Sequence, residues 1–217
     1  MKISDLFAFL FSAAIVAFFV IPFTKDWYDL AYAFSPLLLS FIKFALLATF
    51  GEMLVMRITS GQYYAKNFGL IPKMIIWGLL GLLIYFAFVI FSKGVTALVF
   101  PAGEIDTFLK KTLNAFAISC FMNIIFAPPM MMVHHLTDRF IADHAGKFPV
   151  FQFNTLNLLK KIDWDRMWGF VYAKTIPFFW IPAHTVTFIL PEKFRVLFAA
   201  LLSVFLGLFL AFAKSKK

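Results

Sequence analysis

The stretch VLFAALLSVFLGLFLAFA, residues 196–213, decides the fold class of this chain. It contains no charged residue, and most of its positions are Leu, Val or Phe. Each such residue at the centre of a helix contributes about −0.3 to −0.6 kcal/mol to insertion into a bilayer, so the stretch supplies on the order of −5 kcal/mol. Because a helix that crosses the hydrocarbon core needs about 20 apolar residues, residues 196–213 are predicted to form a transmembrane helix.

Further segments have the same character. Three more are uncharged, namely residues 6–23, 74–92 and 112–133. Two others carry polar residues: residues 37–56 contain Lys43 and Glu52, and residues 167–190 contain Lys174 and two prolines, which can kink a helix. No alternation of apolar and polar residues recurs as a membrane barrel needs. The sequence predicts an all-α integral membrane protein, a bundle of five to six transmembrane helices with a Pro-broken segment at 167–190.

The composition supports this prediction and excludes several other classes. Of the 217 residues, 62% are hydrophobic and 14% charged, which is too apolar for a soluble domain or a disordered chain. The single cysteine, Cys120, excludes a disulfide scaffold. The net charge of +9 is explained by Lys and Arg in the loops of one side, so we expect no nucleic-acid partner. We expect residues 1–217 to form one multi-pass domain in the lipid bilayer, of a bacterial inner membrane or of an organelle if the source is eukaryotic.

Small residues recur at intervals of three or four in three of the predicted helices. The positions are Ala115, Ser119, Asn123 and Ala127; Ala199, Ser203, Gly207 and Ala211; and Gly78 with Gly81. Lipid tails are as apolar as Leu, so helices associate in membranes where small residues let their backbones approach closely. We interpret these positions as helix-packing contacts. The alternative is a narrow polar seam in which Ser119 and Asn123 face a pore.

Glu52 is the most informative ionisable residue. It shares a helical face with Ala45 and Thr49, which places it toward the interior of the bundle. A carboxylate at that depth is costly unless it is paired, hydrated or protonated. One interpretation is that Glu52 lines a hydrated passage, opposite Lys174 of another helix. The other is that it lies near the helix end, beside Arg57, and is simply solvated.

His134 and Asp138 lie one helical turn apart, a spacing that metal sites use. A metal needs three or four converging ligands, and the sequence offers only Asp143 and His144 close by. We therefore interpret the region as a solvated cluster at a helix end and predict no metal and no cofactor. Phosphate loops, dinucleotide fingerprints and hydrolase elbows are absent from the sequence, so we predict no catalytic residues and no enzyme.

Three blocks of residues resemble the Mpv-type family, the small membrane proteins of peroxisomes and the mitochondrial inner membrane. They are Trp27-Tyr28, Pro36 and Gly51-Glu52; residues 109–113 with Asn123 and residues 126–128; and Trp180, Pro182, Phe188, Pro191 and Arg195. The resemblance covers residues 27–213. Residues 6–23 are an additional N-terminal helix. The resemblance implies a four-helix core and, as in some members, a small and weakly selective channel.

The leading functional expectation is therefore a bundle that forms or regulates a passive pathway for small solutes or ions. Because six slim helices enclose little space, we expect a homo-oligomer. The residues expected to line the pathway are Glu52, Lys174, Ser119, Asn123 and His184. The alternative is a non-transporting membrane scaffold or assembly factor, whose small-residue faces bind partner helices. A membrane enzyme with a metal near His134 is the third possibility.

Overall fold

The computed structural model describes residues 3–20, 22–101, 103 and 105–215. Every regular element among these residues is a helix, which confirms the predicted all-α class. The chain divides into two compact units, Met1–Leu39 and Ser40–Lys217.

The first unit contains α1 (Ile3–Val20) and α2 (Pro22–Phe34), which contact each other. The helix predicted over residues 6–23 thus ends at Val20 and a second helix begins at Pro22, residue 21 lying outside the described part. Pro36 disfavours helical backbone at the residue before it, which ends α2, and its fixed φ suits the first turn of the next helix, α3 (Pro36–Ser60). The hydroxyl of Ser35 accepts a hydrogen bond from the Leu38 backbone N–H at 3.2 Å and so caps α3.

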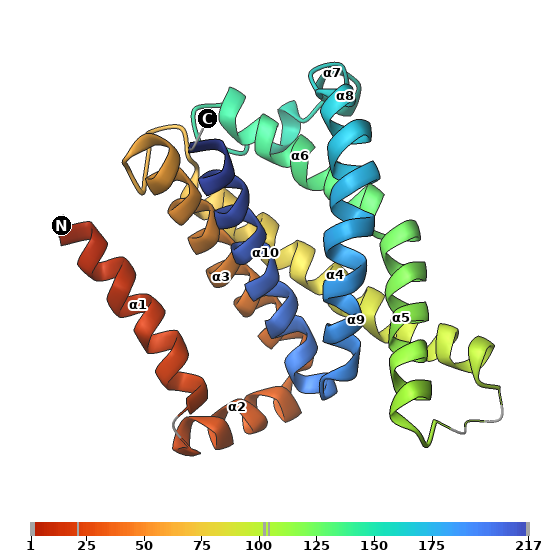
Figure 1. Ribbon diagram of the computed structural model, residues 1–217. Helices are drawn as coiled ribbons and strands as arrows, with labels where there is room; N and C mark the ends of the chain where they lie inside the picture. Colours follow the sequence, from red (N-terminus) through yellow and green to blue (C-terminus); the bar gives the residue numbers. More distant parts are fainter. Residues whose placement is uncertain (1–2, 21, 102, 104, 216–217) are drawn as a thin grey trace. The chain divides into compact units, whose positions relative to one another are not determined.

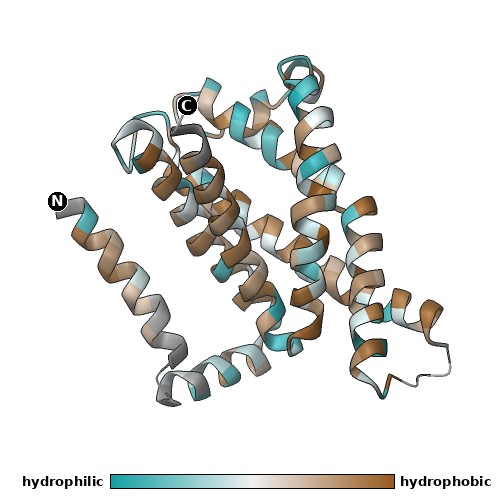
Figure 2. Ribbon diagram, viewed as in Figure 1, coloured by the Kyte–Doolittle hydropathy of each residue, from teal (hydrophilic) through white to brown (hydrophobic). Residues whose placement is uncertain are grey.

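The second unit is built from α3 and four further long helical segments (Figure 1). These are α4 (Leu70–Val99), α5 (Phe108–Ile125) with α6 (Ala127–Asp143), a segment over residues 164–189, and α10 (Glu192–Ser215). Among the described residues, α3, α4 and α10 are long and apolar enough to cross a membrane. A fourth span is present if α5 and α6, which meet at 46°, count as one bent helix. Figure 2 shows the apolar residues along α3 and α10. Three to four such helices indicate a membrane protein.

The prolines of two segments act differently. The segment expected to be broken at Pro177 or Pro182 remains helical from α8 (Trp164–Arg166) through η2 (Met167–Trp180) to α9 (Ile181–Ile189). The hydrogen bonds of η2 are π-helical, so each joins residues five positions apart; the Ile181 N–H, for example, donates to the Ile176 carbonyl oxygen. The helix therefore continues through Pro177. The break lies at Phe126, where Pro128 stands in the first turn of α6.

Glycines set the distance between the long helices. A Cβ atom at Gly78 would lie 2.4 Å from the Phe41 ring, and one at Gly81 would lie 2.8 Å from the Ser40 carbonyl oxygen, so α3 and α4 touch through these glycines. Further along α3, a Cβ at Gly51 would lie 2.9 Å from Val204, and a Cβ at Gly207 would lie 3.1 Å from Val55. These contacts hold α10 against α3.

The remaining small residues of the predicted packing positions lie mostly in the interior. Buried are Ala115, Ser119, Asn123, Ala127, Ala199 and Ala211, whereas Ser203 is half-buried and its hydroxyl donates to the Ala200 carbonyl oxygen. The stripe on α5 faces α9, and Ala127 packs with Ile176 and Trp180.

The connections meet at two ends of the second unit. At one end, Gly69, which precedes α4, contacts Gly146, which follows α6. The segment after Gly146 contains η1 (Val150–Gln152) and α7 (Thr155–Leu159). At the other end, the Arg195 guanidinium at the start of α10 donates to the Ser92 hydroxyl near the end of α4, at 3.3 Å. The end with Gly69 and Gly146 is the one that carries the candidate site.

Candidate functional site

A buried lysine joins three helices at this end of the second unit. The Lys73 ammonium, in the first turn of α4, donates to Glu52 Oε2 of α3 and to Asp138 Oδ1 of α6, both at 2.5 Å. The side chains of Lys73 and Glu52 are 11% and 22% exposed, whereas that of Asp138 is 37% exposed. The ion pairs therefore lie at the edge of the interior, with Asp138 on the side that water reaches.

Two aromatic side chains complete the ionic cluster, which we define as Glu52, Lys73, Trp77, His134 and Asp138. The Trp77 indole N–H donates to Glu52 Oε1 at 2.7 Å. The indole also packs on the His134 ring, with ring centroids 4.3 Å apart. His134 Nε2 lies 4.0 Å from Glu52 Oε1 and 3.9 Å from Asp138 Oδ2. One oxygen, one nitrogen and another oxygen from Glu52, His134 and Asp138 lie within 4.8 Å of one another and could hold a metal ion.

A tight turn fixes the position of Lys73. Gly69, immediately before α4, has φ of 72°, a conformation that favours glycine, and a Cβ there would lie 2.8 Å from the Gly146 carbonyl oxygen. The Gly69 carbonyl oxygen accepts the Lys73 backbone N–H at 2.9 Å. Phe68 lies under the ammonium, which is 5.2 Å from the ring centroid. The turn and the ring thus hold Lys73 between the two carboxylates.

A polar cleft of about 310 Å³ opens beside Asp138. Its charged lining consists of Asp138, Arg139, Lys161, Asp163 and Arg166. Arg139 and Lys161 are held by Asp143, at 3.0 and 2.7 Å. The cleft connects the ionic cluster to the surface between α6 and the segment that follows it.

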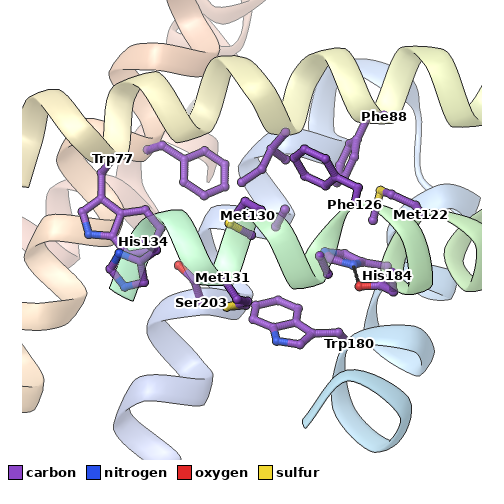
Figure 3. A pocket seen from close by; sticks show the side chains of 15 residues that line it. Trp77, Phe88, Met122, Phe126, Met130, Met131, His134, Trp180, His184 and Ser203 are labelled. Carbon is purple, nitrogen blue, oxygen red and sulfur yellow. Dashed lines mark hydrogen bonds between the residues drawn. The ribbon is translucent and has the colours of Figure 1, made fainter. Parts of the chain in front are cut away.

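On its other side, the ionic cluster borders an apolar cavity of about 50 Å³ inside the bundle. Figure 3 shows Trp77 and His134 at one end of the cavity and Phe88 and His184 at the other, with Met130 between them. Helices α3, α4, α5, α6, η2, α9 and α10 all contribute to the lining. Such a volume has room for only a few water molecules, and an apolar wall gives them few partners.

The far end of the cavity has its own polar network. The Asn123 amide of α5 donates to the Ser119 carbonyl and hydroxyl oxygens, at 2.9 and 3.2 Å, and its oxygen lies 3.1 Å from His184 Nδ1 of α9. The Ser119 hydroxyl donates to the Ile181 carbonyl oxygen at 2.7 Å. All three side chains are buried. The network ties α5 to α9 and leaves Asn123 and His184 on the cavity wall.

Three buried polar atoms in the described part of the chain have no hydrogen-bond partner: Thr49 Oγ1, His134 Nδ1 and Trp180 Nε1. Because a buried polar group without a partner costs about 1–3 kcal/mol, such atoms are rare in native proteins. Two of the three, His134 and Trp180, belong to residues that line the apolar cavity. The wall itself is apolar, so these two side chains contribute ring carbon atoms to it while their nitrogens are buried.

The residues that the sequence singled out for a pathway fall into separate places. Glu52 belongs to the ionic cluster, whereas Ser119, Asn123 and His184 form the network at the far end of the cavity. Lys174 lies exposed on η2, and Glu52 is paired with Lys73 in its place. Whether any of them lines a conducting passage stays a prediction.

The sequence analysis did not single out Lys73 and Trp77, and it treated His134 and Asp138 as a pair without a third ligand. Lys73 was counted as a loop charge because it stands close to the start of an apolar run. The usable signal was that Glu52 lies about two helical turns before the end of one apolar segment and Lys73 within one turn of the start of the next, so both stand near the connection between two adjacent helices.

Comparisons of the chain with protein-family models, with curated proteins and with solved structures found no match.

Proposed function

We propose that this chain is a multi-pass integral membrane protein whose bundle forms a gated passive pathway for small solutes or ions. The observation that carries the proposal is the cavity between the ionic cluster and the Asn123–His184 network, since polar groups stand at both ends of an otherwise apolar interior. Channels use charged side chains at their mouths and apolar constrictions between them as gates.

Five spans in the second unit fit this proposal: α3, α4, the bent pair α5–α6, the segment 164–189 and α10. The last two are long enough at 1.5 Å per residue to cross about 30 Å of hydrocarbon, and α1 would add a sixth span. Lys66, Arg139, Lys147 and Lys161 belong to the end with Gly69 and Gly146, which by the positive-inside rule would be cytoplasmic or on the matrix side.

The ionic cluster would act as the gate. Lys73 ties α3, α4 and α6 together through two charge-assisted hydrogen bonds, and the cavity beside it is too small for anything beyond a few waters. The conformation described here is thus a closed one. Opening requires the three helices to separate at Lys73, or copies of the chain to assemble around a wider passage, as expected for a homo-oligomer.

The test is flux into liposomes that contain the purified protein. Wild type should pass small ions or metabolites faster than empty liposomes, and Glu52→Gln should change the rate because it removes one of the two anchors of Lys73. Asp165→Asn, at an exposed position of α8, is the matched control and should leave the rate unchanged. Wild-type flux no greater than that of empty liposomes, or equal rates for wild type and folded Glu52→Gln, would refute the pathway. Absent flux together with a stoichiometric co-purifying protein would favour the scaffold alternative.

A further inference from the structure

The two carboxylates of the ionic cluster are paired with a cation on one side only. Lys73 contacts Glu52 Oε2 and Asp138 Oδ1. The other two oxygens, Glu52 Oε1 and Asp138 Oδ2, face His134 Nε2 across 4.0 and 3.9 Å. Hydrogen bonds between nitrogen and oxygen are about 2.7–3.2 Å long, so neither approach is a hydrogen bond. A gap wide enough for one bridging atom remains between the three groups.

His134 is held in this orientation by packing. The Trp77 indole covers its ring at 4.3 Å, and the side chain is 16% exposed. Its Nδ1 is buried and has no hydrogen-bond partner among the described residues. The imidazole thus presents Nε2 to two carboxylate oxygens while making no hydrogen bond at either nitrogen. Its Nε2 is therefore free to act as a ligand atom.

The formal charges of Glu52, Asp138 and Lys73 do not cancel. Glu52 and Asp138 bring two negative charges, and Lys73 returns one positive charge. One negative charge therefore remains in the cluster, on the side of the two carboxylates that faces His134 Nε2. Further positive charge between His134 Nε2 and the carboxylates would balance it.

We propose that Glu52, His134 and Asp138 form a binding site for a divalent transition metal ion of the zinc type. Zinc binds imidazole nitrogen and carboxylate oxygen at about 2.0–2.2 Å, so one ion can bridge a nitrogen and oxygens that lie close to twice that distance apart. The three ligand atoms lie within 4.8 Å of one another. His134 and Asp138 stand one turn apart on α6 and Glu52 comes from α3, so the ion would join the two helices.

Three protein ligands leave a fourth coordination position of the metal ion open, and the surroundings of the site can fill it. The polar cleft reaches Asp138, so water has access to a fourth coordination position and the ion has a route in. The Lys73 ammonium, on the opposite side of both carboxylates, repels a metal ion and weakens its binding. Lys73→Met should consequently bind the ion more tightly than wild type does, which a role of the cluster in packing alone does not predict.

The experiment is titration of detergent-solubilised, chelator-stripped protein with Co²⁺, followed by its visible absorption, and with Zn²⁺ in competition with a chromophoric chelator. Wild type should bind one equivalent. His134→Phe, which retains an aromatic ring against Trp77 but removes the nitrogen ligand, should weaken binding at least about tenfold, since even outer-shell partners are worth about 10–100-fold. Asp138→Asn should weaken it as well.

His135→Ala is the matched control, because His135 is the neighbouring histidine on α6 and its Nδ1 faces the Met131 carbonyl oxygen instead. It should bind the ion as wild type does. Circular dichroism identifies any variant that fails to fold. Wild type without saturable binding of Co²⁺ and Zn²⁺, or folded His134→Phe with wild-type affinity, would overturn the proposal. Binding is measured without flux, so this outcome is independent of the proposed pathway.

Discussion

The sharpest stability test of the ionic cluster is Lys73→Met, which keeps an unbranched apolar side chain but removes the charge. The substitution leaves Glu52 and Asp138 facing each other without the ammonium that now contacts both at 2.5 Å. Removing one member of a buried ion pair costs about 3–5 kcal/mol, whereas exposed pairs contribute about 0.2–1 kcal/mol. Since Lys73 is 11% exposed but Asp138 is 37% exposed, we expect a loss of about 2–4 kcal/mol in the free energy of unfolding.

The assay is unfolding of the detergent-solubilised protein with increasing dodecyl sulfate, followed by tryptophan fluorescence and circular dichroism. Lys174→Met is the matched control, because Lys174 lies exposed on η2, and it should change the stability by less than about 0.5 kcal/mol. Adding Glu52→Gln to Lys73→Met should restore part of the loss, since it removes one of the two uncompensated charges. A Lys73→Met protein as stable as Lys174→Met would show that the ion pairs do not hold α3, α4 and α6 together.

Two further predictions test the helix contacts. Gly81→Leu should destabilise the protein by more than about 1–3 kcal/mol, because even its Cβ would lie 2.8 Å from the Ser40 carbonyl oxygen. Gly94→Ala is the control, since a Cβ there meets nothing within 4 Å, and it should be neutral or stabilising by up to about 1 kcal/mol. Equal stabilities for the two variants would contradict the packing of α3 on α4. Asn123→Ala should cost about 1–3 kcal/mol in the same unfolding assay, because it leaves a buried ring nitrogen of His184 without its partner; an unchanged midpoint would show that the network does not join α5 to α9.

Much of the fold follows from local features of the sequence. The apolar runs at residues 74–92 and 196–213 became parts of α4 and α10, since insertion into lipid depends on the sum of side-chain contributions along one segment. The effect of proline was harder to predict. Pro128-Pro129 bends the chain, as a proline pair predicts, but Pro177 lies within a π-helical segment that continues, because a local π-helical arrangement can satisfy the backbone groups that a proline leaves free.

The candidate site shows a similar division. Glu52 was identified from its helical face, and the spacing of His134 and Asp138 was identified as one turn of a helix. Their meeting was not predictable from those local patterns, since Lys73 is 21 residues from Glu52 and 65 residues from Asp138. The rotation of α3 and α6 about their own axes decides whether the two carboxylates face the same lysine.

The sequence by itself therefore determined the solvent and the secondary structure of this protein. A chain so apolar must lie in lipid. Lipid offers no hydrogen bonds, so every spanning segment has to satisfy its backbone hydrogen bonds within itself, as a helix does. Only the tertiary structure decided which ionisable residues share a site. Glycine contacts such as those at Gly78 and Gly69 fix how closely the helices approach and in which register, and a shift of one turn, about 5.4 Å, would separate Lys73 from both of its carboxylates.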